Sequence, residues 1–236
     1  MILQSISKAI REQNYYAVML EFVIVIAGVV IGFQIQAWAE ARAEQSRAQY
    51  YLNRLYLDLQ LSAEEQAETE QYYLEYHRNA ADISNALTRD AVDEGEMNSL
   101  ATRINSLGGF RDIRVIDTTL VQLFESGDIA LIQPIGLQEA ITRFYSQYRL
   151  AHQGNDNATR IHLENISRLN DLVVHEWIDG ARQVVAIEPD DPQLASVIES
   201  MAWAYSTYGF LQSKFTQETE AMRDTLRPYV DGSVNR

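Results

Sequence analysis

The 236-residue chain contains no cysteine, only four prolines and only four histidines. The absence of cysteine excludes disulfides, thiolate metal ligands and cysteine nucleophiles within the chain. None of the histidines has a glutamate three residues before it, the spacing at which helical bundles hold a di-iron centre. On one helix, His152 and His162 would lie roughly 15 Å apart, too far to share a metal. We therefore expect no metal site and no cofactor.

The common catalytic motifs are also absent. The sequence contains no glycine-rich phosphate loop, no H-E-x-x-H zinc pattern and no G-x-S-x-G nucleophile turn. We therefore expect that the protein is not an enzyme.

Basic residues are few. The chain has 19 lysines and arginines against 33 aspartates and glutamates, which gives a net charge of −14. The charges of residues 1–35 sum to zero, so the whole excess lies in residues 36–236. An acidic domain repels phosphates, and we expect no nucleic-acid partner.

One long apolar run stands out at residues 17–38. From Ala17 to Phe33 its only charged side chain is Glu21, and the run reaches membrane-spanning length at about 1.5 Å per residue. We expect a transmembrane helix over 17–38 in the lipid bilayer, preceded by an amphipathic surface segment over 1–16. The alternative is a cleaved signal peptide with an A-x-A site at 37–39. The helical pattern runs through that site without a break, which favours the retained anchor.

Small and polar residues share one narrow stripe of the expected anchor helix. At 100° per residue this stripe contains Glu21, Val25, Gly28, Gly32 and Gln36. Small residues allow a second helix backbone to approach closely in a membrane. Glu21 either orients the helix at the membrane interface, contributes to a helix–helix contact, or handles a proton or ion.

Aromatic and basic residues flank the run on both sides. Tyr15 and Tyr16 are expected at one membrane interface and Trp38 at the other. Two basic residues precede the run and two follow it closely, so the positive-inside bias is small. We expect the usual arrangement of such anchors, with the amino terminus in the cytoplasm and the large carboxy-terminal domain outside the membrane.

The remaining sequence has the pattern of amphipathic helices. No proline or glycine occurs between Trp38 and Gly95, so we expect the anchor to continue as one helix to about Asp90. The heptad-like spacing and the turn residues predict further helices over 96–107, 118–125 with Asp117 as N-cap, 137–178, and from Asp190 or Asp191 to Pro228. Strand character is limited to 115–116 and 129–132.

These elements predict an all-α fold. We expect one amino-terminal transmembrane helix that continues into an antiparallel helical bundle of about four main helices over 39–228. Residues 229–236 are expected to form a flexible tail.

Two groups of side chains within the bundle have a polar or aromatic character. Asn155, His162 and Asn165 fall on the apolar seam of the 137–178 helix, where they either line a ligand pocket or form a satisfied structural network. Tyr72, Tyr73, Tyr76 and His77 are expected at the edge of the core.

The apolar run and the residues just after it contain a motif formed by Glu21-Phe22, Ile24-Val25, Gly28-Val29, Ile31-Gly32, Gln34, Trp38 and Glu40-Arg42. In this motif the chain resembles a family of uncharacterised bacterial membrane proteins with one amino-terminal span and a helical domain of unknown function, and the resemblance is strongest there. It continues through Tyr51-Leu52, Leu55, Asp58-Leu59, Thr119, Leu123, Ser126-Gly127, Leu131-Ile132, Leu137, Ile141 and Tyr145. The resemblance implies a protein of the Gram-negative inner membrane with no assigned activity. It supports the expected single-pass topology, in which the helical domain would lie in the periplasm.

Three functions fit these features. The first is a non-catalytic, membrane-anchored protein that acts in assembly, either by self-association or as an accessory subunit of other membrane proteins. The second is a periplasmic ligand-sensing bundle. The third is a proton-coupled single-span subunit that uses Glu21.

Overall fold

The computed structural model describes residues 15–89, 93–112, 115–188 and 191–230, without the side chains of residues 15–18, 21 and 94. Over these ranges 84% of residues are helical, and the elements are five α helices, two short 3-10 helices and one pair of strands. The fold is therefore predominantly α-helical, as the sequence predicts. The chain divides into two units, Met1–Tyr50 and Tyr51–Arg236.

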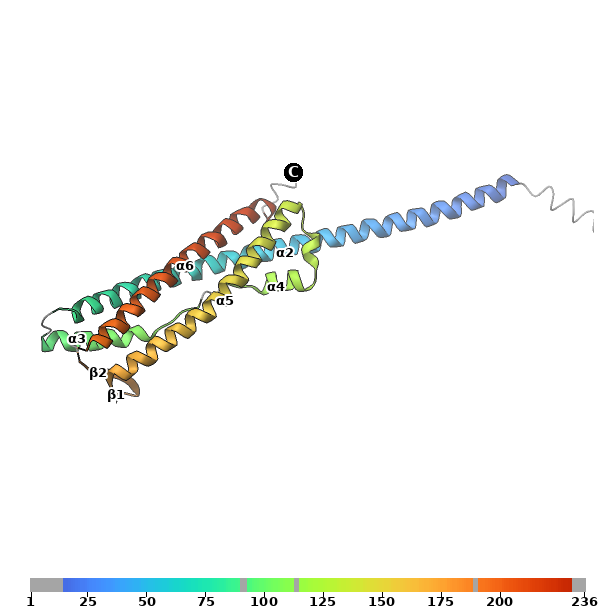
Figure 1. Ribbon diagram of the computed structural model, residues 1–236. Coiled ribbons are helices and arrows are strands. Elements are labelled where there is room, and N and C mark those ends of the chain that lie inside the picture. Colours follow the sequence, from blue (N-terminus) through green and yellow to red (C-terminus); the bar gives the residue numbers. More distant parts are fainter. Residues whose placement is uncertain (1–14, 90–92, 113–114, 189–190, 231–236) are drawn as a thin grey trace, which may run out of the picture. The chain divides into compact units, whose positions relative to one another are not determined.

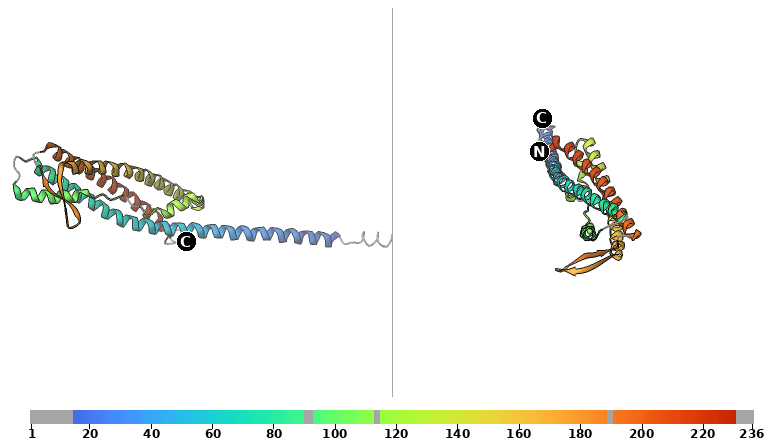
Figure 2. Two further views of the ribbon diagram at one scale, coloured as in Figure 1. Left: turned by 90° about the horizontal axis from the view of Figure 1, so that it is seen from below. Right: turned by 90° about the vertical axis from the view of Figure 1, so that its left-hand side faces the viewer.

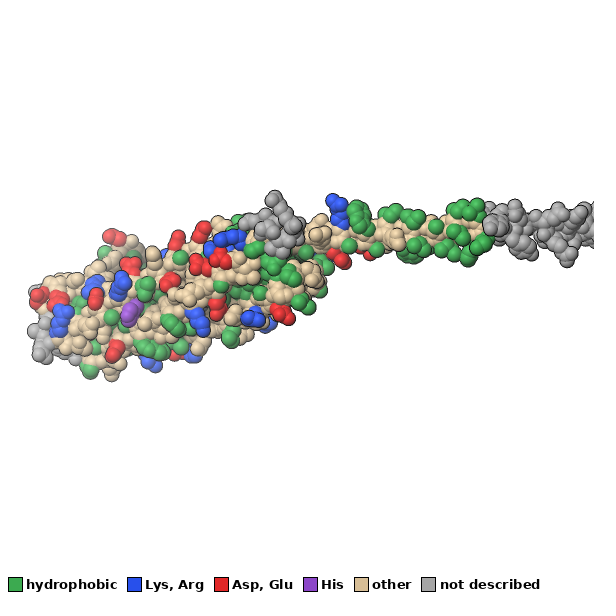
Figure 3. Space-filling view, turned by 90° about the horizontal axis from the view of Figure 1, so that it is seen from above, with side chains coloured by type: hydrophobic (Ala, Val, Ile, Leu, Met, Phe, Trp, Pro, Cys, Tyr) green, Lys and Arg blue, Asp and Glu red, His purple; other side chains and the backbone are tan. Residues whose placement is uncertain are grey.

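Helix α2 (Tyr15–Leu87) begins in the first unit. All the side chains described between Met19 and Arg47 are exposed, and Figure 3 shows groups of hydrophobic side chains along the described amino-terminal helix. By length and composition this stretch is long and apolar enough to cross a membrane. A signal sequence near the amino terminus would meet the same criterion, so both alternatives from the sequence remain.

In the second unit, α5 (Ile135–Leu172) packs against α6 (Pro192–Val230). The rest of α2 contacts α6, where the Tyr76 ring packs against Tyr205 and His77 Nδ1 lies 2.9 Å from the Ala202 carbonyl. Figures 1 and 2 show the three helices running lengthwise beside one another. Each helix buries residues three and four apart, which places them on one face. On α6, this face carries Leu194, Ile198, Met201, Tyr205, Gln212, Phe215, Thr219, Met222 and Leu226.

Two short helices and an extended segment lie between α2 and α5. Helix α3 (Glu94–Asn105) begins with a cap in which the Glu96 amide donates to the Asp93 carboxylate at 2.8 Å. The 3-10 helix η1 (Ser106–Gly108) follows, and α4 (Thr118–Glu125) and η2 (Asp128–Leu131) come later in the chain. We call the described residues 106–112 and 115–117 the connector.

Strands β1 (Val173–Ile178) and β2 (Ala181–Ile187) form an antiparallel hairpin that projects from the helices (Figure 2). The prediction of a helix as far as residue 178 was therefore wrong, as was the restriction of strand character to 115–116 and 129–132. Asp179 and Gly180 both have positive φ, 51° and 79°, as a tight two-residue hairpin turn requires. β-branched residues on both sides of this Asp-Gly pair favour strands over a continued helix.

Two helix ends also differ from the prediction. Pro228 lies inside α6, which ends at Val230, because a proline near the last turn removes only one backbone donor and does not force an end. Asp117 precedes α4 as predicted, but its side chain makes no capping bond; its carboxylate instead accepts from the Tyr148 hydroxyl at 2.7 Å.

The interior of the second unit alternates between apolar and polar layers. A large apolar cluster contains residues of α2, α3, α6 and the hairpin, including Ile83, Ile104 and Ile198. Toward the other end Leu55, Leu59 and further aliphatic residues are buried. Between these apolar regions the buried residues include polar ones on α2 and α6, which are Ser62, Gln66, Thr69, Gln212, Thr216 and Thr219.

Candidate functional site

The predicted anchor stripe is open along its described length. Val25 is exposed, and a Cβ added at Gly28 or Gly32 would meet nothing within 4 Å. The Gln36 amide donates to the Glu40 carboxylate at 2.9 Å, one turn further along the same helix. The side chain of Glu21 lies outside the described residues. Nothing in the described part of the first unit therefore occupies the stripe.

The predicted interface residues can be placed only in part. Trp38 is exposed, and the guanidinium of Arg42 lies 5.4 Å from its ring centroid. The side chains of Tyr15 and Tyr16 lie outside the described residues, as do residues 1–14 of the surface segment expected over 1–16.

Two of the three predicted pocket residues bind the connector. The Asn155 amide donates to the Asp112 carboxylate at 2.7 Å, and His162 Nε2 lies 3.4 Å from the Gly108 carbonyl. The third, Asn165, is buried on the same helix. Burial lowers the pKa of His162 below its ordinary value of 6.5. The hydrogen bond with the Gly108 carbonyl has the opposite, smaller effect on this pKa. His162 is thus suited to donating a hydrogen bond from a neutral ring.

Tyrosines from α2 and α6 hold the same segment from the other side. The Tyr205 hydroxyl donates to the Leu107 carbonyl, and the Tyr73 hydroxyl donates to the Arg111 carbonyl. Burial is the main cause that raises the pKa of both hydroxyls, so they remain protonated donors at neutral pH. Their rings pack edge-on and tilted against neighbouring aromatic side chains, which are those of Tyr72, Tyr76, Tyr208, Phe110 and His162.

The end of the connector is fixed by a second polar group on α2. Ser62 Oγ accepts from the Ile116 amide at 2.9 Å and donates to the Asp58 carbonyl at 2.6 Å. The buried Asp58 carboxylate accepts from the Thr119 hydroxyl. Helices α2, α5 and α6 therefore each bind the described connector, and their side chains supply hydrogen-bond partners for several of its backbone groups.

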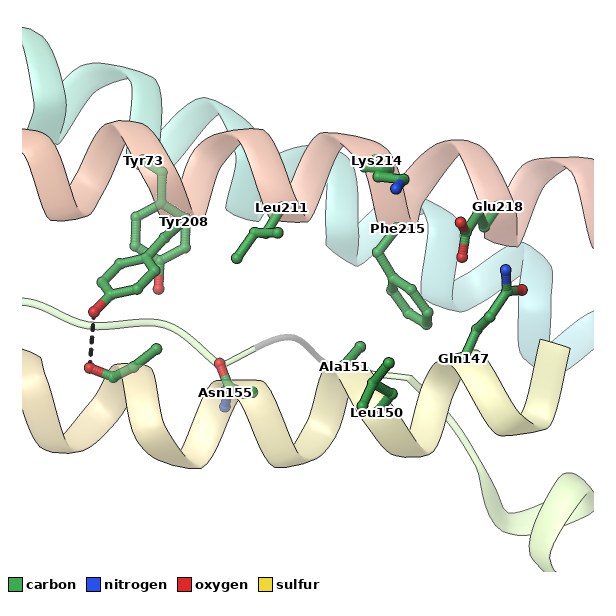
Figure 4. A pocket seen from close by; sticks show the side chains of 12 residues that line it. Tyr73, Gln147, Leu150, Ala151, Asn155, Tyr208, Leu211, Lys214, Phe215 and Glu218 are labelled. Carbon is green, nitrogen blue, oxygen red and sulfur yellow. Dashed lines mark hydrogen bonds between the residues drawn. The ribbon is translucent and has the colours of Figure 1, made fainter. Parts of the chain in front are cut away.

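A groove of about 370 Å³ lies between α5 and α6. Its apolar middle comes from Leu150 and Ala151 on one helix and from Leu211 and Phe215 on the other (Figure 4). Phe215 is buried, whereas Leu150 and Leu211 are 70% and 49% exposed. A Cβ at Gly154, which also lines the groove, would meet nothing within 4 Å. The small residues of α5 thus leave space that α6 does not fill.

The two ends of the groove differ in chemistry. Tyr73, Tyr208 and Asn155 lie at one end, where the Tyr208 hydroxyl donates to the Ala158 carbonyl at 3.0 Å (Figure 4). Glu218 of α6 and Gln147 of α5 lie at the other end, and Lys214 lies on α6 beside Phe215. The arrangement can accept an elongated apolar molecule with a polar head.

The predicted pocket residues coincide with this groove only at Asn155. His162 and Asn165 do not line it. Sequence reasoning missed Lys214, Leu211 and Phe215. A signal for them existed in the small residues Ala151, Gly154 and Ala158, spaced three and four apart on the α5 face that meets α6.

No group of three or more histidines, aspartates and glutamates that could hold a metal occurs in the part of the chain that the structure describes.

Comparison of the chain with protein-family models, with curated proteins and with solved structures finds no match.

Proposed function

We propose that this protein is a non-catalytic, single-pass protein of the bacterial inner membrane that acts in assembly through its anchor helix. It associates with itself or serves as an accessory subunit of other membrane proteins. Its amino terminus lies in the cytoplasm and its helical domain in the periplasm.

The observation that carries this proposal is the open stripe of the anchor. Gly28 and Gly32 are one helical turn apart, and neither has a neighbour near its Cβ position. Lipid chains are as apolar as the side chains of the helix, so close backbone packing between small residues is a main source of helix association in a membrane. A polar residue, Gln36, extends the stripe by a further turn.

The shape of the second unit supports a scaffolding role over a catalytic one. We infer that it is an antiparallel bundle in which α3, the connector and α4 together take the place of a fourth long helix. Its buried polar side chains on α2 and α5, such as Ser62, Asn155 and His162, bind the connector. They are therefore engaged in holding the chain together.

The test is the mass of the full-length protein extracted in a mild detergent. The double variant Gly28→Ile/Gly32→Ile places two branched side chains on the stripe and should reduce the mass of the complex to that of a monomer. A matched control is Ala27→Ile/Ala37→Ile, which adds similar bulk on the opposite face of the same helix and should leave the mass unchanged.

Light scattering coupled to gel filtration separates the alternatives. A single-component complex indicates self-association, and co-purifying proteins that are lost in the glycine double variant indicate an accessory subunit. A complex whose mass is the same in the glycine double variant and in the wild type contradicts assembly through this face.

A further inference from the structure

The groove between α5 and α6 has a feature that the proposed assembly does not use. It combines an apolar middle with one positive side chain, Lys214. Lys8 and Lys214 are the only lysines among the 236 residues. Lys214 is exposed, and no hydrogen bond or ion pair joins its ammonium to another of the described residues.

We propose that this groove binds an amphipathic molecule with a single carboxylate, and that Lys214 pairs with the carboxylate. The hydrocarbon part lies between Leu150 of α5 and Leu211 of α6, above the ring of Phe215. The proposal is independent of assembly through the anchor.

The size and exposure of the groove fit such a ligand. Its volume of about 370 Å³ falls within the roughly 300–1,000 Å³ range of small-molecule sites. Leu150 and Leu211 are large apolar side chains that remain substantially exposed, and a ligand in the groove would remove both from water. Lining by apolar side chains with a few polar groups at the ends is typical of such sites.

Charge and position decide which head group fits. Lys214 lies between Leu211 and Phe215 in the sequence of α6 and lines the groove, whereas Glu218 lies one turn further along α6 near Gln147 (Figure 4). A carboxylate at the end of an apolar chain therefore meets Lys214 first. Glu218 is an acidic neighbour on the same rim, so it opposes a negative ligand and limits its affinity.

The end of the groove at Tyr208 and Asn155 determines the chemistry of the ligand end that carries no carboxylate. Tyr208 already donates to the Ala158 carbonyl, and the Asn155 amide donates to Asp112. These donors are used within the protein, so the far end of the ligand needs no strong acceptor. An aliphatic or aromatic monocarboxylate meets this condition.

The two lysines allow a direct test on the full-length protein in lipid nanodiscs. A brief pulse of a water-soluble acetylating ester labels accessible amines, and mass spectrometry measures the acetylated fraction of Lys214 with Lys8 as the internal reference. The probe is octanoate, and octanamide is its uncharged counterpart. At ten times its Kd, octanoate leaves about one site in eleven free and should slow labelling of Lys214 about tenfold. Labelling of Lys8 should not change, and octanamide should have little effect.

Variants locate the site. Gly154→Leu places a large side chain in the groove and should abolish the protection of Lys214 from acetylation by octanoate. The substitution should not weaken α5, because leucine favours a helix more than glycine does. Glu218→Gln should lower the Kd for octanoate, whereas the matched control Glu220→Gln, an exposed glutamate of α6 that does not line the groove, should leave it close to that of the wild type. Lys214→Gln should lose the saturation-transfer NMR signal that the wild type gives with octanoate.

Three outcomes would overturn the proposal. Equal protection by octanoate and octanamide would remove the role of the carboxylate. Protection that persists in Gly154→Leu would place the probe outside the groove. An unchanged saturation-transfer signal in Lys214→Gln, or a weaker octanoate affinity in Glu218→Gln, would contradict the assigned roles of the two charged side chains.

Discussion

The contact between Tyr205 and the connector offers a quantitative test of how the helical domain is held together. Tyr205 is 1% exposed and Leu107 is fully buried, and the Tyr205 hydroxyl donates to the Leu107 carbonyl. The substitution Tyr205→Phe keeps the ring and removes only the donor. It leaves a buried carbonyl without this bond, which costs about 2 kcal/mol.

This loss translates into a measurable change in melting temperature. For domains of 150–250 residues, 1 kcal/mol corresponds to about 2–4 °C, so Tyr205→Phe should lower the midpoint by roughly 4–8 °C. The assay is thermal unfolding of the full-length protein in mild detergent, followed by circular dichroism.

The control is Tyr208→Phe, which removes a hydroxyl from the same aromatic cluster. Its acceptor, the Ala158 carbonyl, lies in the middle of α5. The same carbonyl also accepts the helical hydrogen bond from the backbone amide four residues later in α5. The expected decrease in the midpoint is therefore less than half of that for Tyr205→Phe. A midpoint for Tyr205→Phe within 1 °C of the wild type, or an equal decrease in the midpoint of both variants, would contradict the reasoning. The hydrogen bond from Tyr205 to the connector would then not be a major contribution to the stability of the domain.

Three further predictions concern other positions. Burial lowers the folded-state pKa of His162, so below its ordinary value of 6.5 the unfolded chain takes up a proton that the folded domain resists. The domain should therefore lose stability as the pH falls below 6.5, and His162→Gln should flatten the pH dependence of the melting temperature below pH 6.5. Gln212 is fully buried, and no donor among the described residues bonds its Oε1 atom. Gln212→Met should raise the free energy of unfolding in a urea titration by about 1 kcal/mol, and a decrease would contradict the reasoning. Gly180 has a φ of 79° at the hairpin turn, so Gly180→Ala should destabilise the hairpin by about 1 kcal/mol. Hydrogen exchange should accelerate in β1 and β2 but not in α6, and acceleration throughout the domain would show that the hairpin supports the whole fold.

The sequence predicted the helices well wherever a long periodic pattern coincided with a clear break. Asp93, Gly127 and Asp191 mark boundaries in the structure close to the predicted ones, because capping and positive φ depend on local chemistry. The hairpin at 173–187 was missed although its signal was local too. The apolar residues of 169–178 fit the helical period of α5, while the Asp179-Gly180 turn and the β-branched residues beside it favour strands.

The site residues divide in a similar way. The small-residue stripe of the anchor follows from spacing alone, since the helix period fixes which residues share a face. The partners of Asn155 and His162 did not follow from spacing. Asp112 and Gly108 lie 43 and 54 positions away, and only the path of the connector through the domain brings them close.

By itself, the sequence determined the apolar run of membrane-spanning length, the predominance of helix and the absence of cysteine chemistry, because each depends on composition or on a local period. The tertiary structure decided that side chains of α2, α5 and α6 bind the described connector residues, and that Lys214, Phe215 and the small residues of α5 border one groove. The first result depends on how α2, α5 and α6 surround the connector, and the second on how α5 packs against α6. That packing depends on side-chain volumes of more than one helix together, and the small residues of α5 indicate only one side of the groove.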